Sequence, residues 1–351
     1  MEPGAEDSPA DATPQRRMHL AARLEDAFHA FRERRGRCRG LVPTIIPFPG
    51  YGGDGWLRVL GRVVLAKPGR RTPDRYTNIR GWRSFTSIPV RDAELQVSVD
   101  GVTHVIRADR GGVIDARIEA HLAPGWGTTL LTLEGSDVIE EPVFVVAQDV
   151  TFGFVSDIDD TVMVTALPHP LLAAWNSFVL NEHARRAVPG MAVLYDRLAA
   201  AHPGSPVVYL STGAWNIVPT LNRFLSRHLF PRGAFLLTDW GPTPDRWFRN
   251  GQEHKTANLA RLAAEFPQVR WLLVGDDGQH DEVRYREFAA RHPDNVAAVA
   301  IRELTPGQAV FSGGRAQRAE HEGAAPWVYG GDGAELADAL AALGLLDAPR
   351  A

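Results

Sequence analysis

The stretch VTFGFVSDIDDTV, residues 150–162, places three aspartates directly behind an apolar run. A short and nearly continuous apolar run predicts a strand buried on both faces, as in a parallel sheet. Asp157, Asp159 and Asp160 follow this strand. Like charges so close together repel, and burial strengthens the repulsion. We therefore expect a positive group beside these aspartates.

Strands and helices alternate after Val150. The apolar runs SPVVYLST, GAFLLTD, VRWLLVGDD and NVAAVAIREL are separated by the amphipathic stretches GMAVLYDRLAAAH, VPTLNRFLSRH, HKTANLARLAAEFP and HDEVRYREFAARHP. This alternation predicts an α/β fold with a doubly wound parallel sheet covered by helices on both faces, over residues 150–305. A C-terminal extension, residues 306–351, follows with one more helix at 333–346.

Residues 41–149 have a different pattern, with short runs rich in Val, Ile, Leu and Thr broken by Gly, Pro and Asp. The segment VDGVTHVI holds an Asp-Gly turn between two alternating runs, which indicates a hairpin. We predict a smaller β-sandwich-like domain here. An amphipathic helix at 18–40 precedes it, and residues 1–17 form a disordered tail. The apolar stripe of the helix consists of Leu20, Leu24, Phe28 and Phe31.

Composition indicates a cytoplasmic protein. The chain of 351 residues is 44% hydrophobic and 23% charged, as is typical of globular proteins. Its one cysteine, Cys38, allows no internal disulfide, and we see neither a signal peptide nor an apolar run long enough to span a membrane. Residues 58–91 carry nine Lys or Arg against one acid, Asp74. This basic segment is either a solvated face or a peripheral contact with an anionic membrane; we expect no nucleic acid.

Polar residues stand where four predicted elements meet one edge of the sheet. In open parallel sheets, sites form at the carboxyl ends of the strands. The first predicted strand ends at Asp157–Thr161, and the second strand ends at Ser211-Thr212. Lys255 opens the helix after the third strand. The fourth strand is followed by Asp276, Asp277 and Asp281.

These residue types suit phosphoryl transfer. Asp157 and Asp159 are one residue apart, so in an extended chain their side chains point the same way. One can attack phosphorus, while the other protonates the leaving oxygen and later activates water. A divalent ion between Asp157 and Asp276 would relieve the repulsion, and Mg²⁺ prefers such oxygen ligands. Ser211 can bind a phosphate oxygen, and Lys255 can offset negative charge.

The motifs SDIDDTV, VYLSTGAWN, TDWG followed by HK, and GDDGQHDEVRY resemble those of the haloacid-dehalogenase-like phosphohydrolases. Within that superfamily their order and spacing resemble the catalytic domain of the actin-patch phosphatidate phosphatase family. The resemblance implies a Mg²⁺-dependent hydrolase with a Rossmann-like catalytic domain. It implies phosphatidate as the substrate, hydrolysed to diacylglycerol through an aspartyl-phosphate.

The resemblance also implies roles for individual residues. Asp157 would be the nucleophile and a metal ligand. Asp159 would be the acid/base, and its backbone carbonyl would bind the metal. Asp276 would be a further metal ligand, and Asp277 or Asp281 would add a contact beside it. Phosphate would be bound by Thr161, Ser211, Thr212 and Lys255. Two departures touch the phosphate pocket. The family has Ser-Asn-Ser-Pro-Trp where this chain has Ser211-Thr212-Gly213-Ala214-Trp215, and a serine where it has Asp277.

Other interpretations of single motifs are weaker. A calcium loop starting at Asp157 would need Gly and Glu where Val162 and Pro168 stand. The sequence GYGGDG, residues 50–55, matches a dinucleotide fingerprint but runs into a strand-like segment, so we expect a loop. His254 and His280 are either assistants of the reaction or ordinary surface residues.

Two segments could shape substrate choice. Residues 166–180 follow the first strand, where the superfamily places cap insertions, and residues 240–252 carry Trp240, Trp247 and Phe248 before Lys255. Each is either an apolar lid, ordinary packing or an interaction surface. Two functional alternatives also stay open: a phosphatase of a soluble phosphate ester, and a non-catalytic binding module.

Overall fold

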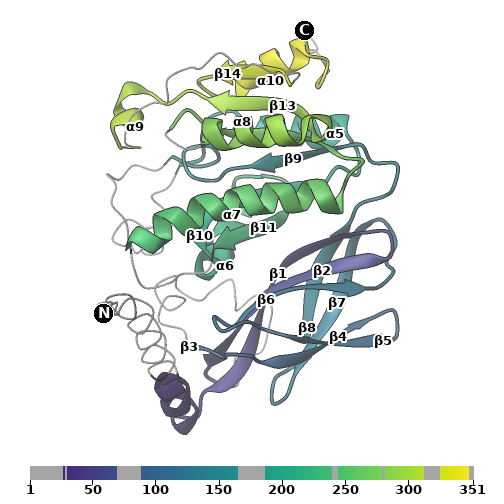
Figure 1. Cartoon of the computed structure of the whole chain (residues 1–351), viewed down its shortest axis with the longest axis vertical. Helices are drawn as coiled ribbons and strands as arrows, with labels where there is room; N and C mark the ends of the chain where they lie inside the picture. The colour runs from purple at the N-terminus through teal and green to yellow at the C-terminus, as the bar shows by residue number, and fades with distance from the viewer. Residues whose placement is uncertain are drawn as a thin grey trace, which may run out of the picture.

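The computed structural model describes residues 27, 30–68, 88–164, 186–238, 244–278, 281–311 and 325–347, with side chains omitted at 244–252 and 310–311. The expected tail at 1–17, most of the helix at 18–40 and the segment at 166–180 lie outside the described residues. Residues 30–38 of that helix are helical. Figure 1 shows a β-rich module below an α/β domain.

The α/β domain is built on six parallel strands in the order β11-β10-β9-β12-β13-β14. After β9 the chain adds β10 and β11 on one side of the sheet, and then β12, β13 and β14 on the other side. The predicted doubly wound sheet is therefore present. The last strand, β14, was not predicted. The strands are β9 (Phe152–Ser156), β10 (Val207–Ala214), β11 (Ala234–Thr238), β12 (Arg270–Asp276), β13 (Val296–Arg302) and β14 (Trp327–Gly330).

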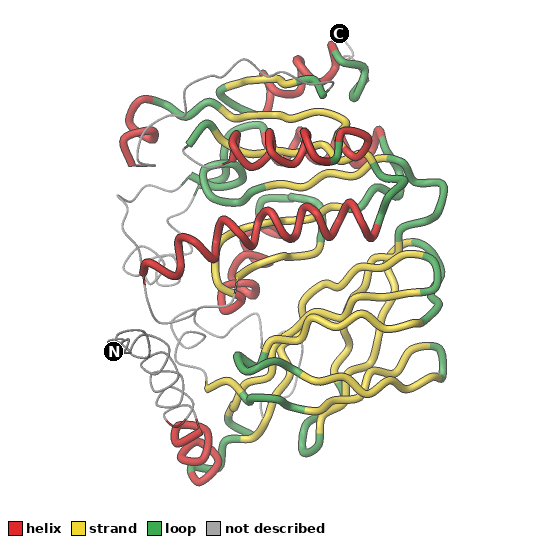
Figure 2. The backbone as a smooth tube through the Cα atoms, viewed as in Figure 1, coloured by secondary structure: helices red, strands yellow, loops and turns green. Residues whose placement is uncertain are grey.

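Helices connect these strands and flank the sheet, as Figures 1 and 2 show. α7 and α8 lie in front of the sheet in Figure 1, and α10 packs against α5. None of the helices in the described part of the chain is both long and apolar enough to cross a bilayer. The helices are α5 (Met191–Ala201), α6 (Val218–Arg227), α7 (Pro244–Glu265), α8 (Asp281–Arg291), α9 (Pro306–Phe311) and α10 (Gly333–Ala342), with 3₁₀ turns at Trp215–Ile217 and Pro293–Asn295.

The β-rich module forms one connected sheet and not two separate ones. Its order is β3-β2-β1-β8-β7-β4-β5, with β6 beside β2. Buried side chains from strands at both ends of this order form one cluster, so the sheet curls around its own core. The strands are β1 (Val42–Gly53), β2 (Trp56–Ala66), β3 (Ile88–Pro89), β4 (Glu94–Val99), β5 (Val102–Arg107), β6 (Val113–Glu119), β7 (Gly125–Leu133) and β8 (Ile139–Val145).

The glycines of GYGGDG do not form the loop that we expected. Gly50, Gly52 and Gly53 belong to β1, and only the turn around Gly55 links it to β2. The two strands lie so close that a Cβ on Gly52 would be 2.4 Å from the carbonyl oxygen of Trp56. No helix follows, so the dinucleotide interpretation fails as well.

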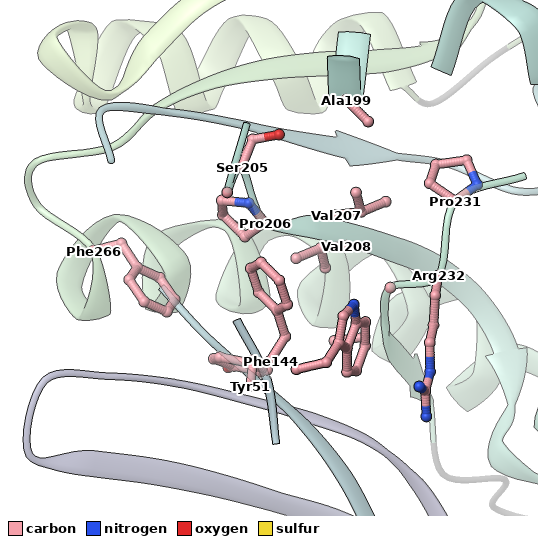
Figure 3. A pocket seen from close by; sticks show the side chains of 14 residues that line it. Tyr51, Phe144, Ala199, Ser205, Pro206, Val207, Val208, Pro231, Arg232 and Phe266 are labelled. Atoms are coloured by element: carbon pink, nitrogen blue, oxygen red, sulfur yellow. The ribbon is translucent and has the colours of Figure 1, made fainter. Parts of the chain in front are cut away.

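The two modules pack tightly. Side chains of β1 and β2, including Phe48, Tyr51 and Trp56, belong to the same buried cluster as the core of the α/β domain. A cavity of about 200 Å³ lies at this boundary and is lined by Tyr51 and Phe144 of the β-rich module and by Phe266 and Arg232 of the α/β domain (Figure 3). The cavity is at the amino-terminal ends of β10 and β11, the edge opposite to the polar strand ends.

Candidate active site

The first strand of the domain delivers Asp157 to the point where the strand order reverses. Asp157 directly follows β9, and its N–H donates to the carbonyl of Val274 in β12 at 2.9 Å. Asp276 is the last residue of that neighbouring strand. A ligand crevice forms at such a reversal in open α/β sheets. The two motifs that carried the prediction are therefore side by side.

Three carboxylates meet at this edge. Asp157, Asp276 and Asp281 each offer one oxygen, and these oxygens lie within 4.8 Å of one another. Asp281 is the first residue of α8, and Gly275 makes its approach possible. A Cβ on Gly275 would lie 2.7 Å from Asp281 Oδ2, so any larger residue would push this carboxylate away.

Lys255 is the expected positive group. Its Nζ donates to Asp157 Oδ1 and to Asp281 Oδ1, each at 2.6 Å, and all three side chains are buried. Its place in the helix differs from the prediction: α7 begins at Pro244, eleven residues earlier, so Lys255 does not open the helix. The cation is held by its carboxylate partners and not by an anion at a helix terminus.

The pKa values describe a strongly charged site. Burial raises the pKa of Asp157 well above its ordinary value, the ammonium of Lys255 lowers it, and Asp281 and Asp159 raise it again. Burial together with Asp281 and Asp157 likewise raises the pKa of Asp276. Burial alone would lower the pKa of Lys255, but the two carboxylates raise it. One ammonium thus pairs with two of the three carboxylates.

Arg302 is a second buried cation near the aspartates, and sequence analysis did not single it out. It ends β13 with only 3% of its surface exposed. Its Nη1 donates to the carbonyl of Asp160 at 2.6 Å, and its Nη2 donates to Gln308 Oε1 at 2.9 Å. Asp160 has a φ of 55°, a conformation that aspartate tolerates better than most residues. Arg302 therefore fixes the turn that carries Asp159.

The predicted phosphate-binding residues Ser211 and Thr212 lie in the last part of β10, where its pairing with β11 shifts register between Leu210 and Ala214. Ser211 is buried, and its Oγ accepts the N–H of Gly213 at 3.0 Å. Thr238, at the end of β11, places its Oγ1 2.7 Å from the carbonyl oxygen of Thr212 and 3.1 Å from that of Gly213. The neighbouring strand thus holds this part of β10 in place.

The other predicted residues lie around this centre. Thr161 is fully buried, and its Oγ1 has no hydrogen-bond partner among the described residues. Asp159 is half-buried and close enough to raise the pKa of Asp157. Asp277 accepts the N–H of Leu304 with Oδ1 at 2.8 Å, so this oxygen points toward the end of β13 and not into the carboxylate group.

His254, beside Lys255, has a largely buried ring that contacts its own helix and the neighbouring strand. Burial lowers its pKa to about 4, which leaves the ring neutral near pH 7. The ring nitrogens lie 3.0 and 3.1 Å from Nδ2 of Asn258, and the ring also hydrogen-bonds the backbone of Leu236 in β11. Residues 240–243 and His280 lie outside the described residues, and 244–252 are helical backbone and not a loop.

The carboxylate group fits a divalent cation. Asp157, Asp276 and Asp281 present oxygen ligands, which Mg²⁺ prefers. Asp281 Oδ2 is buried and has no hydrogen-bond partner in the described part of the chain. The unpaired oxygen and the raised pKa values both indicate that positive charge is in deficit here.

The region that carries this site is similar to known proteins. Residues 152–303 match the family model described as phosphatidate phosphatase APP1, catalytic domain. This confirms the resemblance expected from the motifs, over 43% of the chain. Over the same region the chain is 24% identical to the phosphatidate phosphatase APP1 of Saccharomyces cerevisiae, of which it covers 25%.

Two other proteins are also similar to this chain, one in sequence and one in structure. An uncharacterized protein of Schizosaccharomyces pombe is 22% identical over 151 residues, which are 25% of its length. The chain thus spans about a quarter of the curated relatives that it matches. A crystal structure of a HAD family hydrolase from Deinococcus radiodurans, with bound phosphate and sodium, covers 57% of this chain and 99% of its own at 16% identity and a TM-score of 0.32.

Proposed function

We propose that this chain is a Mg²⁺-dependent phosphomonoester hydrolase that works through a phospho-Asp157 intermediate, with phosphatidate as the substrate. One observation carries the proposal. Asp157, Asp276 and Asp281 converge beside Lys255 within the region that matches the phosphatidate phosphatase catalytic domain. This combination supplies a nucleophile, a cation and a set of metal ligands at one strand edge.

In the first step a carboxylate oxygen of Asp157 attacks phosphorus. Lys255 occupies Oδ1, so Oδ2 is the nucleophile in this proposal. A bond forms between Oδ2 and phosphorus, and the bond from phosphorus to the ester oxygen breaks. Asp159 in its protonated form gives its proton to that oxygen, which leaves as an alcohol.

The second step restores the enzyme. Asp159, now a carboxylate, takes a proton from a water molecule as the water oxygen attacks phosphorus. The bond from phosphorus to Oδ2 of Asp157 breaks, and inorganic phosphate is released. Asp159 is then protonated and Asp157 ionised, which is the starting state.

The remaining residues bind and orient the phosphate. Ser211 and Thr212 contribute hydroxyl groups, the free hydroxyl of Thr161 can donate to a phosphate oxygen, and Lys255 offsets negative charge. Mg²⁺ bound by Asp157 and Asp276 would stabilise the charge that develops on the phosphoryl oxygens. Asp281, which shares Lys255 with Asp157, would keep the ammonium in line with the site.

Phosphatidate as the substrate rests on the similarity of this region to the yeast phosphatidate phosphatase and to the catalytic domain of the matching family. The rival is a soluble phosphate ester. The deciding experiment measures phosphate release from phosphatidate in mixed micelles with Mg²⁺, beside hydrolysis of p-nitrophenyl phosphate. Asp157→Asn and Asp159→Asn should abolish both activities, and the exposed Asp196→Asn should leave both unchanged.

Each outcome of this experiment is informative. Release from phosphatidate that needs Asp159 and the metal supports the whole proposal. Hydrolysis of p-nitrophenyl phosphate alone contradicts the lipid substrate and favours a soluble ester. No turnover of either compound favours a non-catalytic module.

Peripheral contact with an anionic membrane is a further part of the proposal. Within the basic segment at 58–91, Arg58 already pairs with two acids and the structure does not describe 69–87. Sedimentation with anionic and neutral liposomes tests the contact. Equal binding to both would contradict it.

A further inference from the structure

Helix α7 carries two neighbouring stripes of side chains, each with spacings of four, three and four residues. Residues so spaced lie on one side of a helix. The first stripe is apolar apart from Lys255, and all its members are buried. This stripe consists of Lys255, Leu259, Leu262 and Phe266, of which Phe266 directly follows the helix. The polar stripe beside it consists of His254, Asn258, Arg261 and Glu265.

The polar stripe contacts the β-rich module. Arg261 Nη1 forms an ion pair with Asp115 Oδ2 at 2.7 Å, across 146 residues of chain. Glu265 accepts a hydrogen bond from the hydroxyl of Tyr51 at 2.8 Å and forms an ion pair with Arg58. Arg58 also pairs with Asp115 at 2.6 Å. We call Arg58, Asp115, Arg261 and Glu265 the α7 clamp.

The clamp is partly shielded from solvent. The side chains of Glu265 and Arg58 are 6% and 13% exposed, and that of Asp115 is 33% exposed. Burial would raise the pKa of Asp115, but Arg261 and Arg58 lower it, so this acid is ionised near pH 7. Removing one member therefore leaves a poorly solvated charge without its partner.

A chain of side-chain contacts leads from the clamp toward the site. Arg261 donates to Oδ1 of Asn258, and Nδ2 of Asn258 contacts the ring and donates to the carbonyl of His254. His254 precedes Lys255, whose Nζ bridges Asp157 and Asp281. The helix rises about 1.5 Å per residue, so a slide by one residue would break both 2.6 Å contacts.

We propose that the β-rich module is a positioning unit for the active site: its clamp residues Arg58 and Asp115 fix the rotation and axial position of α7 and so hold Lys255 between Asp157 and Asp281. This inference rests on the proposed function. The apolar contacts of Phe266 with Tyr51 and Trp56, at ring distances of 5.9 and 5.3 Å, hold the modules together but tolerate sliding. Directional ion pairs are the contacts that specify a register.

A double-mutant cycle on the full chain tests the inference. The readout is the dissociation constant of inorganic phosphate in the presence of Mg²⁺, measured by calorimetry. Asp115→Ala should weaken phosphate binding about tenfold, because Lys255 is no longer held in place. In a Lys255→Ala background the same substitution should change binding less than about twofold, because its effect acts through Lys255.

Two controls separate positioning from folding. Glu94→Ala removes an acid from an exposed ion pair with Arg107 in the same module, and should leave phosphate affinity unchanged. Asp115→Glu keeps the charge and should restore most of the affinity. Melting temperatures show that each variant is folded at the assay temperature, and Asp115→Asn replaces Asp115→Ala if the latter is not.

The outcomes distinguish this inference from the proposed function. Equal affinities of Asp115→Ala and Glu94→Ala, or an effect of Asp115→Ala that persists without Lys255, would overturn the clamp. Hydrolysis of p-nitrophenyl phosphate by the unaltered chain is measured in parallel. Its absence would contradict the proposed function, while the phosphate-binding cycle would still decide on the clamp.

Discussion

The ring of Phe48 in the β-rich module lies parallel to the indole of Trp215, with ring centroids 5.1 Å apart and planes 6° apart. Trp215 directly follows β10, the strand that carries the proposed phosphate-binding residues Ser211 and Thr212, so this stack is a second contact between the module and the proposed site. Both rings are buried. The β-rich module therefore reaches the site at two points, through Trp215 and through α7.

We predict that Phe48→Ala destabilises the protein by about 3–5 kcal/mol, because it removes a fully buried ring and leaves a cavity. Phe48→Leu keeps most of the apolar volume and loses the stack, and should cost about 1 kcal/mol. Urea unfolding measures both values. A similar small cost for the two variants would show that the stack contributes little.

Removing Lys255 should affect stability as well as turnover. Lys255→Met leaves the carboxylates of Asp157 and Asp281 without their ammonium, and we expect a loss of about 3–5 kcal/mol in metal-free buffer. The exposed Lys67→Met is the matched control and should change stability by less than about 0.5 kcal/mol. Denaturant unfolding in EDTA checks this. An unchanged midpoint for Lys255→Met would mean that the acids are protonated in the native state.

Mg²⁺ should stabilise the chain by binding among the carboxylates. Burial and mutual repulsion raise the pKa of Asp157 and Asp276, so both are less stable as anions in the folded state than in the unfolded state. Asp276→Asn should therefore raise the melting temperature in EDTA at pH 7 and abolish the increase that Mg²⁺ produces. A cation at a hundredfold excess over its dissociation constant stabilises by about 2.7 kcal/mol.

Asp277→Asn is the control for this experiment, because its Oδ1 already accepts the N–H of Leu304. It should keep the response to Mg²⁺. If Asp277→Asn lost the response and Asp281→Asn kept it, the metal would sit on the other side of Asp276. The family's serine at position 277 makes this comparison useful for substrate choice too.

The strand ends were predictable because their signals are local. The apolar run before Asp157 and the GDD after the fourth strand fix both the strands and the edge at which their acids emerge. The helical pattern was recognised only from His254, so the start of α7 was missed, although proline at Pro244 suits the first turn of a helix. β14 has only four residues, and half of them are buried.

The partners of the site could not be predicted from local patterns. Asp115 and Arg261 are 146 residues apart, and nothing in either neighbourhood indicates the other. Arg302 resembles any charged residue that ends a strand, and only the packing of the Asp160 turn against β13 gives it a role. The choice between Asp277 and Asp281 depends on where α8 begins, because the first turn of that helix points Asp281 back at Gly275.

Glu141 is fully buried in the β-rich module, and no cation among the described residues pairs with it. Its Oε1 accepts the N–H of Leu60 at 2.7 Å, and Thr129 donates to its Oε2 at 2.9 Å. The N–H of Leu60 lies where β1 bulges between Phe48 and Tyr51, so Glu141 replaces a missing strand partner. Burial raises the pKa of Glu141 to about 8, although both hydrogen bonds lower it.

The sign of the pH effect follows from this shift. Between pH 4.5, its ordinary pKa, and about 8, the folded state holds a proton that the unfolded state releases. Stability should therefore fall as pH rises through this window, by up to about 1.4 kcal/mol per unit, and level off above it. Glu141→Gln keeps an acceptor for Leu60 but cannot ionise. Its advantage over the unaltered chain should be near zero at pH 4.5 and largest at pH 9, measured by urea unfolding. Parallel pH profiles of the two proteins would show that Glu141 is ionised in the fold, with its charge stabilised by its two hydrogen bonds.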